Sequence, residues 1–177
     1  TQTPAGDIET LFSLTQPVVR RQAAAPVRVR RSAPVGLELQ IMRLVMAIPQ
    51  LAVLLDQVAM QDAAKLAPDG AAMLQSLVLA ALSLGEYGQF AALAEILRDA
   101  GGDFDALITE IAGQGDLDPQ LAQLELAGAI RQMRMQALRA EADQLVACGL
   151  ADDVSRQRWR EIMASLEQLK KQAVGGA

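Results

Sequence analysis

The sequence predicts an all-α protein: a compact bundle of short helices followed by a long helix and a C-terminal helical hairpin. Of its 177 residues, 51% are apolar but only 3% are aromatic. Leu, Ala, Met and Ile must therefore fill the core, and these residues favour packed helices over sheets. Apolar residues recur at helical spacing from Gly36 onward, and no alternating strand pattern interrupts residues 37–113.

Residues 1–35 are expected to form a flexible, basic linker. Asp7 to Phe12 have the pattern of one or two helical turns. Residues 16–34 then hold three prolines and five arginines with little apolar surface to bury. Such a composition is typical of linkers.

The first helices are predicted from apolar stripes and proline positions. A helix over 37–47 places five apolar residues on one stripe: Leu37, Ile41, Leu44, Val45 and Ile48. Pro49 fits the first turn of a second short helix, about 49–57, because a first-turn residue needs no N–H hydrogen bond. Asp69 is expected to cap a third helix over 70–84. That stretch includes the most apolar run, 71–84, whose 14 residues are fewer than the roughly 20 needed to cross a membrane.

Two further short helices are predicted between glycine breaks. Gly85 and Gly88 bracket a turn before a helix over 89–100. Asp103 is then expected to cap a helix over 104–112. These elements complete a body of short helices.

The longest helix and the hairpin follow. Asp118-Pro119 predicts a helix start, and the pattern runs to about Ala147, where Gly149 ends it. A last helix covers 153–173. Both carry apolar residues at spacings of 3, 4 and 3, namely Met135, Leu138, Ala142 and Leu145, then Trp159, Ile162, Leu166 and Leu169. Because the turn is short, we expect the two helices to pair antiparallel along these stripes.

The composition excludes most catalytic chemistry. The chain has no histidine and one cysteine, Cys148, so Ser–His and Cys–His catalysis, an internal disulfide and most zinc sites are excluded. Cys148 is interpreted as a small packing residue. The acidic pairs at 103/105, 116/118 and 152/153 lie at predicted helix starts and lack the spacing of a calcium loop. We expect them to act as helix caps, and we expect no metal site.

The charge is unevenly distributed. Residues 37–130 hold three bases and thirteen acids, whereas residues 131–177 hold eight bases and six acids. A strongly acidic body is a poor non-specific ligand for DNA, so we do not expect this chain to bind nucleic acid strongly.

The final hairpin is the predicted binding element, because two helices bury only one stripe each and leave other apolar side chains exposed. Trp and Arg are frequent in protein–protein hot spots. The candidate contact residues are Arg156, Arg158, Trp159, Arg160, Ile162, Met163 and Leu166.

The junction near residue 40 carries a resemblance to a known family. The basic pair Arg30-Arg31 leads to IMRLVMAIPQLA at 41–52, an apolar helix ended by a proline that a Leu-Ala pair follows. This junction and the order of helices after it resemble the C-terminal domain of bacterial DNA primase, which binds the replicative helicase. The resemblance covers about residues 36–172.

The resemblance implies a non-catalytic domain that recruits primase to the replication fork for RNA primer synthesis. It divides the chain into a linker with a remnant of the polymerase domain (1–35), a helical bundle (36–128) and a hairpin (129–177). The implied partner is the helicase N-terminal domain, in the bacterial cytoplasm. Zinc and magnesium are implied for a parent DNA-directed RNA polymerase, with no cofactor in this fragment. A second implied partner is the acidic tail of single-strand DNA-binding protein, with four candidate residues: Arg30, Arg31, Met42 and Arg43.

Two other functions fit the residue pattern. The N-terminal collar domain of a replicative helicase has a similar arrangement of helices. A helical DNA-binding regulator would read duplex DNA with the helix over 153–173.

Overall fold

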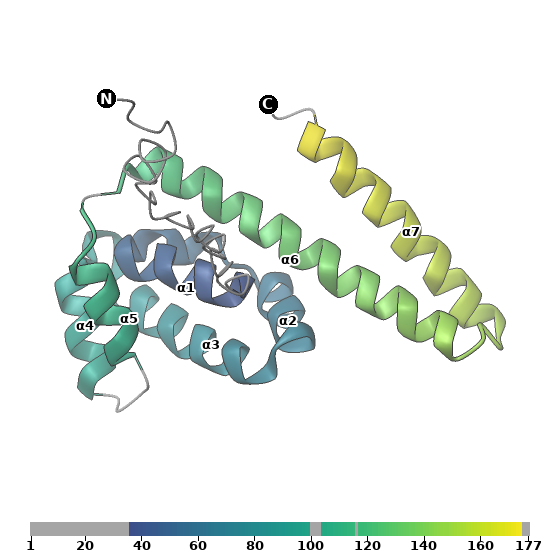
Figure 1. Ribbon diagram of the computed structural model, residues 1–177, viewed down its shortest axis with the longest axis horizontal. Helices are drawn as coiled ribbons and strands as arrows, with labels where there is room; N and C mark the ends of the chain where they lie inside the picture. The colour runs from purple at the N-terminus through teal and green to yellow at the C-terminus, as the bar shows by residue number, and fades with distance from the viewer. Residues whose placement is uncertain (1–35, 100–103, 116, 175–177) are drawn as a thin grey trace, which may run out of the picture. The chain divides into compact units, whose positions relative to one another are not determined.

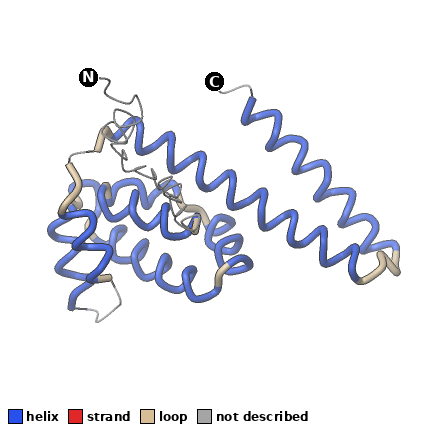
Figure 2. The backbone as a smooth tube through the Cα atoms, viewed as in Figure 1, coloured by secondary structure: helices blue, strands red, loops and turns tan. Residues whose placement is uncertain are grey.

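The computed structural model describes residues 36–99, 104–115 and 117–174 (Figure 1). The fold class is confirmed, since these residues form helices and loops and contain no strand (Figure 2). The α-helices are α1 Leu37–Ala47, α2 Gln57–Leu66, α3 Pro68–Ser83, α4 Phe90–Asp99, α5 Asp105–Ala112, α6 Pro119–Ala147 and α7 Asp153–Val174. Two 3₁₀ helices, η1 Pro49–Leu54 and η2 Gly85–Tyr87, join them.

Helix α1 has the predicted bounds and lies at the centre of the body. Ile41, Leu44 and Val45 of its predicted stripe are buried, and Leu37 and Ile48 pack against the same core. The helix ends at Ile48, whose extended backbone is the conformation favoured before a proline.

The region after Pro49 differs from the prediction of one helix over 49–57. Pro49–Leu54 forms the 3₁₀ helix η1, and a new helix, α2, begins after Asp56. The Asp56 carboxylate accepts a hydrogen bond from the Ala59 N–H at 2.7 Å, which makes it the cap of this helix. Helix α2 is absent from the sequence prediction because its fully buried apolar residues are alanines, Ala59 and Ala63, while Met60 and Leu66 are only partly buried.

The predicted cap of α3 is also wrong. The helix begins at Pro68, so Asp69 lies inside its first turn and makes no capping hydrogen bond. Its charge still lies near the positive end of the helix dipole. Helices α4 and α5 match the predicted elements within a residue or so, and the predicted cap Asp103 lies outside the described residues.

Helix α6 has the predicted bounds and cap. The Asp118 carboxylate accepts a hydrogen bond from the Gln120 N–H at 2.9 Å. One face of α6 packs against the body core through Ala122, Leu126, Ala129 and Met133, and Ala137 is buried one turn further on. At 1.5 Å per residue, its 29 residues span about 43 Å.

The turn after α6 reverses the chain through a glycine. Gly149 has φ 79°, and its N–H donates to the Val146 carbonyl at 2.9 Å, while the Leu150 N–H donates to the Leu145 carbonyl at 3.2 Å. These two bonds form the Schellman motif that often ends a helix. Asp152 then caps α7 by accepting from the Ser155 N–H at 2.6 Å.

The described residues form two apolar clusters, and α6 contributes to both. The larger cluster is the core of the body and ends at Met133 on α6. The smaller one lies between α6 and α7 around Ala142, Ile162 and Leu166. The expected division at residues 128/129 falls inside the continuous α6, and residues 35–177 belong to one compact unit.

Candidate partner-binding surface on the helical hairpin

The seam of the hairpin follows the predicted stripes. Ala142, Ile162 and Leu166 are buried, and Met135, Leu138, Leu145 and Trp159 pack around them. Ile162 is 1% exposed and Leu166 is 5% exposed. These two candidate contact residues therefore hold α7 against α6, and in this conformation neither offers its side chain to a partner.

Trp159 is half-buried beside this cluster. Its indole contributes to the closure of the hairpin, and the remaining part of its surface is accessible. A substitution at Trp159 would therefore alter both the seam and the surface.

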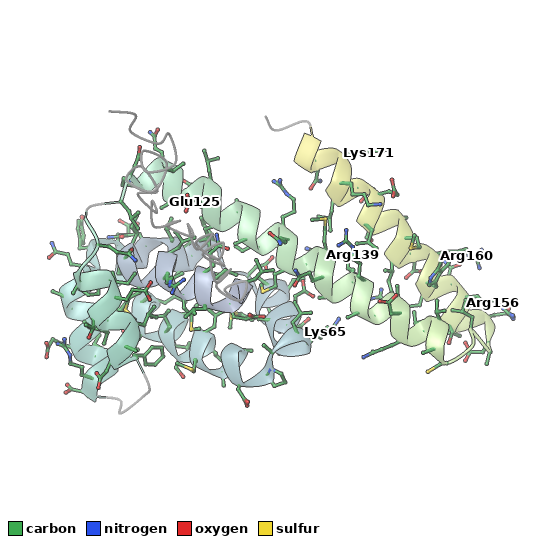
Figure 3. The ribbon with its side chains drawn as sticks, viewed as in Figure 1. Lys65, Glu125, Arg139, Arg156, Arg160 and Lys171 are labelled. Atoms are coloured by element: carbon green, nitrogen blue, oxygen red, sulfur yellow. The ribbon has the colours of Figure 1, made fainter. Side chains whose placement is uncertain are left out.

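The three predicted arginines lie on opposite edges of α7. Successive helical residues are about 100° apart, so Arg156, Arg160 and Met163 fall within about 60° of one another and about 140–160° from Arg158. Figure 3 shows Arg156 and Arg160 on the outer side of α7, pointing away from α6. The predicted rim of three arginines is therefore divided into two separate groups.

The first group lies on what we call the free edge, formed by Arg156, Arg160 and Met163 of α7 with Arg139 and Val146 of α6. Met163 is 37% exposed and Val146 is 54% exposed. Arg139 and Val146 lie about 140–160° around α6 from Glu141, which marks the opposite edge of the hairpin. The free edge combines accessible apolar side chains with basic ones, as expected of a protein-binding surface.

The side chains of the free edge are held only by local bonds. An Arg156 Nη2 donates to the Asp153 carboxylate at 2.7 Å, one turn away on the same helix. The Arg160 Nε donates to the Arg156 carbonyl at 3.4 Å. A partner that binds these groups has no long-range ion pair to break.

The opposite edge carries Arg158, whose Nε donates to Glu141 on α6 at 2.7 Å. The Lys65 Nζ of α2 donates to the other oxygen of Glu141 at 3.0 Å. The hydrogen bond from Arg158, with a further contribution from Lys65, lowers the pKa of Glu141 despite partial burial. The same bond raises the pKa of Arg158.

The residues expected to hold an acidic tail do not form a site among the described residues. Met42 is 4% exposed and belongs to the body core, so it is not an apolar floor on the surface. Arg43 is paired with Glu110, with Nε and Nη2 at 2.9 and 3.0 Å from its two oxygens. Arg30 and Arg31 lie outside the described residues.

A second surface, not predicted from sequence, is an apolar groove of about 470 Å³ on the body. Its walls come from η1, the end of α3, η2 and one residue of α6, namely Pro49, Gln50, Leu51, Val53, Leu54, Ala81, Leu82, Gly85, Glu86 and Gln123. Val53 and Leu82 are exposed there. The sequence feature that could have indicated this groove is the apolar run at residues 51–55. We had expected a regular helix there, which would have buried part of the run in the core.

The part of the chain that the structure describes holds neither a cluster of metal ligands nor a helix able to span a membrane. Within residues 36–99, 104–115 and 117–174, no three His, Cys, Asp or Glu side chains gather as metal ligands would. None of the helices described there combines the length and the apolar character needed to cross a membrane. Cys148 lies exposed in the turn after α6, so its interpretation as a packing residue is wrong.

No protein-family model, curated protein or solved structure was found to match the chain.

Proposed function

We propose that this chain is a non-catalytic adaptor, the helicase-interaction domain of a bacterial DNA primase. In this role the hairpin docks on the N-terminal domain of the replicative helicase and brings primase to the replication fork. The body of short helices makes a second contact that modulates the helicase. Polymerase chemistry, with its zinc and magnesium, belongs to other parts of the parent protein in the cytoplasm.

The order of elements supports this proposal. The resemblance at Arg30-Arg31 and residues 41–52 implies a helical body, one long helix and a terminal hairpin in that order. The described residues have the same order, with α1 to α5 in the body, α6 shared, and α7 closing the hairpin. Agreement of architecture supports the family assignment without depending on any single motif.

The free edge of the hairpin is the observation that carries the docking role. It offers Met163 and Val146 to solvent beside three arginines, in a chain whose residues 37–130 are strongly acidic. Of the seven contact residues expected from sequence, we retain Arg156, Arg160 and Met163 as direct contacts. Trp159, Ile162 and Leu166 support them by keeping the hairpin closed.

The proposal does not extend to the acidic tail of single-strand DNA-binding protein. Met42 is in the core and Arg43 is already paired, so two of the four expected residues would first have to rearrange.

The docking role is tested with a charge reversal on the free edge. The double variant Arg156→Glu/Met163→Glu should raise the Kd for a purified bacterial replicative helicase about 10- to 100-fold, which is the range of one or two hot-spot residues. Binding is measured by titration calorimetry or fluorescence anisotropy.

The matched control is Arg98→Glu/Leu79→Glu on the body. Arg98 resembles Arg156, since each is half-exposed (49% and 54%) and paired one turn away on its own helix. Leu79 is an exposed apolar residue of α3. The control should change the Kd less than about threefold. Equal affinity of the hairpin variant and the wild type would disprove docking by the free edge.

A further inference from the structure

Glu141 is bonded at the same time to two other helices. One carboxylate oxygen lies 2.7 Å from the Arg158 Nε of α7, and the other lies 3.0 Å from the Lys65 Nζ of α2. The Glu141 side chain is 22% exposed, whereas the arginine and the lysine are about half exposed. A carboxylate from the long helix thus lies between a cation of the body and a cation of the hairpin.

These bonds are the side-chain polar links of α7 and α2 to the rest of the protein. Within the described ranges, every other recorded side-chain bond of α7 stays within α7 and its cap, and α2 has no other polar side-chain link to another helix. Figure 3 shows Lys65 reaching from α2 toward the half of α6 that also pairs with α7.

The apolar contacts at this place are small. The fully buried apolar residues are Ala59 and Ala63 on α2 and Ala137 on α6, while Met60 and Leu66 of α2 are only partly buried against the body core. Alanine contacts permit sliding and tilting more readily than large interlocking side chains do. A charged group with two fixed partners therefore adds a directional restraint that these small contacts between α2 and α6 do not supply.

We infer that Glu141 is an ionic joint that couples the hairpin to the body. Because the same carboxylate pairs with both cations, loss of Lys65 or Arg158 weakens the bond between Glu141 and the other cation. Lys65 then influences the order of α7, although it lies on a different helix and bonds only to Glu141. This coupling is independent of which partner the hairpin binds.

The inference predicts a linked change in amide hydrogen exchange. In the full chain, Glu141→Gln keeps the side-chain shape but removes the charge. Exchange should become about two- to fivefold faster in the last turn of α2 and in the first half of α7 together, the range expected for partly exposed ion pairs. The matched control is Glu167→Gln, which removes the exposed Glu167–Lys170 pair within α7 and should leave α2 unchanged.

The variant Lys65→Gln distinguishes a shared ionic joint at Glu141 from two independent ion pairs. With a joint, this variant accelerates exchange in α7 as well as in α2. With independent pairs, only α2 responds, and that result would overturn the inference. Unchanged exchange in Glu141→Gln would overturn it as well.

The double variant Glu141→Arg/Arg158→Glu tests the same idea in the other direction. It restores an ion pair between α6 and α7 but places an arginine opposite Lys65. Exchange in α7 should return toward the wild-type rate while α2 stays fast. Recovery of both helices would contradict a shared carboxylate. Circular dichroism of each variant verifies that the helices are retained.

Discussion

Asp62 is the buried charged side chain of the described core, at 6% exposure. It lies on α2, one turn before Lys65, and its Oδ2 has no hydrogen-bond partner. Desolvation raises the pKa of Asp62, and the nearby charges of Lys65 and Arg134 only partly oppose this, while Asp56 and Glu141 add to it. The ionised side chain is therefore less favourable in the folded protein than in the unfolded chain.

Asp62→Asn should consequently stabilise the protein at neutral pH. A raised folded-state pKa in an acid means that stability is lost as the pH rises from the unfolded value of 3.8 through the folded one. The amide removes this penalty, and we expect a gain of about 1 kcal/mol at pH 7 that disappears near pH 3, where Asp62 is protonated. Urea unfolding at the two pH values measures it. A loss of stability at pH 7 that disappears near pH 3 would contradict this and mean that Lys65 or Arg134 depends on the charge.

At the scale of single residues, the sequence identified charged side chains of interest but not the oppositely charged residues with which they pair. Arg43 and Arg158 were identified as candidate contacts, yet each is paired with an acid 67 or 17 positions away. A linear pattern does not reveal such pairs, because they depend on how helices cross. Ile162 and Leu166 were assigned both to the seam and to the binding surface, and a two-helix hairpin allows them only the first.

At the scale of helices, the sequence predicted an element correctly where particular residues mark its start, its end or its buried face. The Asp118-Pro119 start, the Gly149 stop and the 3-4-3 apolar spacing predicted α6 and the hairpin seam. Helix α2 was missed because its fully buried apolar residues are alanines, and α3 starts two residues earlier than predicted because Pro68 begins it. Burial of small residues has little hydrophobic signature in a sequence.

Two glycines, one within α6 and one in the turn after it, should respond to alanine with opposite signs. Gly149 has φ 79° and Gly128 lies within α6, and an added Cβ meets no atom within 4 Å at either position. Sterics are therefore equal, and only backbone conformation differs. Gly149→Ala should destabilise by about 1 kcal/mol, and Gly128→Ala should stabilise by about 0.5–1 kcal/mol. Thermal unfolding of both variants measures the difference. Shifts of the same sign would contradict the left-handed turn at Gly149.

At the scale of the molecule, acidic and basic charges are segregated. The body is acidic, the hairpin is mildly basic, and Glu141 is an acid of the hairpin that faces cations from both sides. Segregation of this kind favours a partner surface with acidic groups at the hairpin and disfavours nucleic acid along the body.

The contribution of Glu141 to stability should depend on pH. Its folded-state pKa lies below the ordinary value of 4.5, so its contribution is complete above that value and is lost as the pH falls through the folded pKa. The wild type should therefore be more stable than Glu141→Gln at pH 7, with a smaller difference at pH 3. Thermal melts of the two proteins at both pH values test this. A constant difference would assign the effect to packing and not to charge.

The continuity of α6 has a mechanical consequence. A helix of about 43 Å without a proline or a break after its first turn behaves as a stiff lever, with its residues 122–133 packed on the body and the hairpin turn at its far end. A tilt of about 5° at Met133, where the body core ends, moves the end of α6, about 21 Å away, by about 2 Å. Small rearrangements among the short helices therefore produce a larger displacement at the hairpin turn. Conversely, a force applied at the hairpin turn exerts a torque on the body through α6.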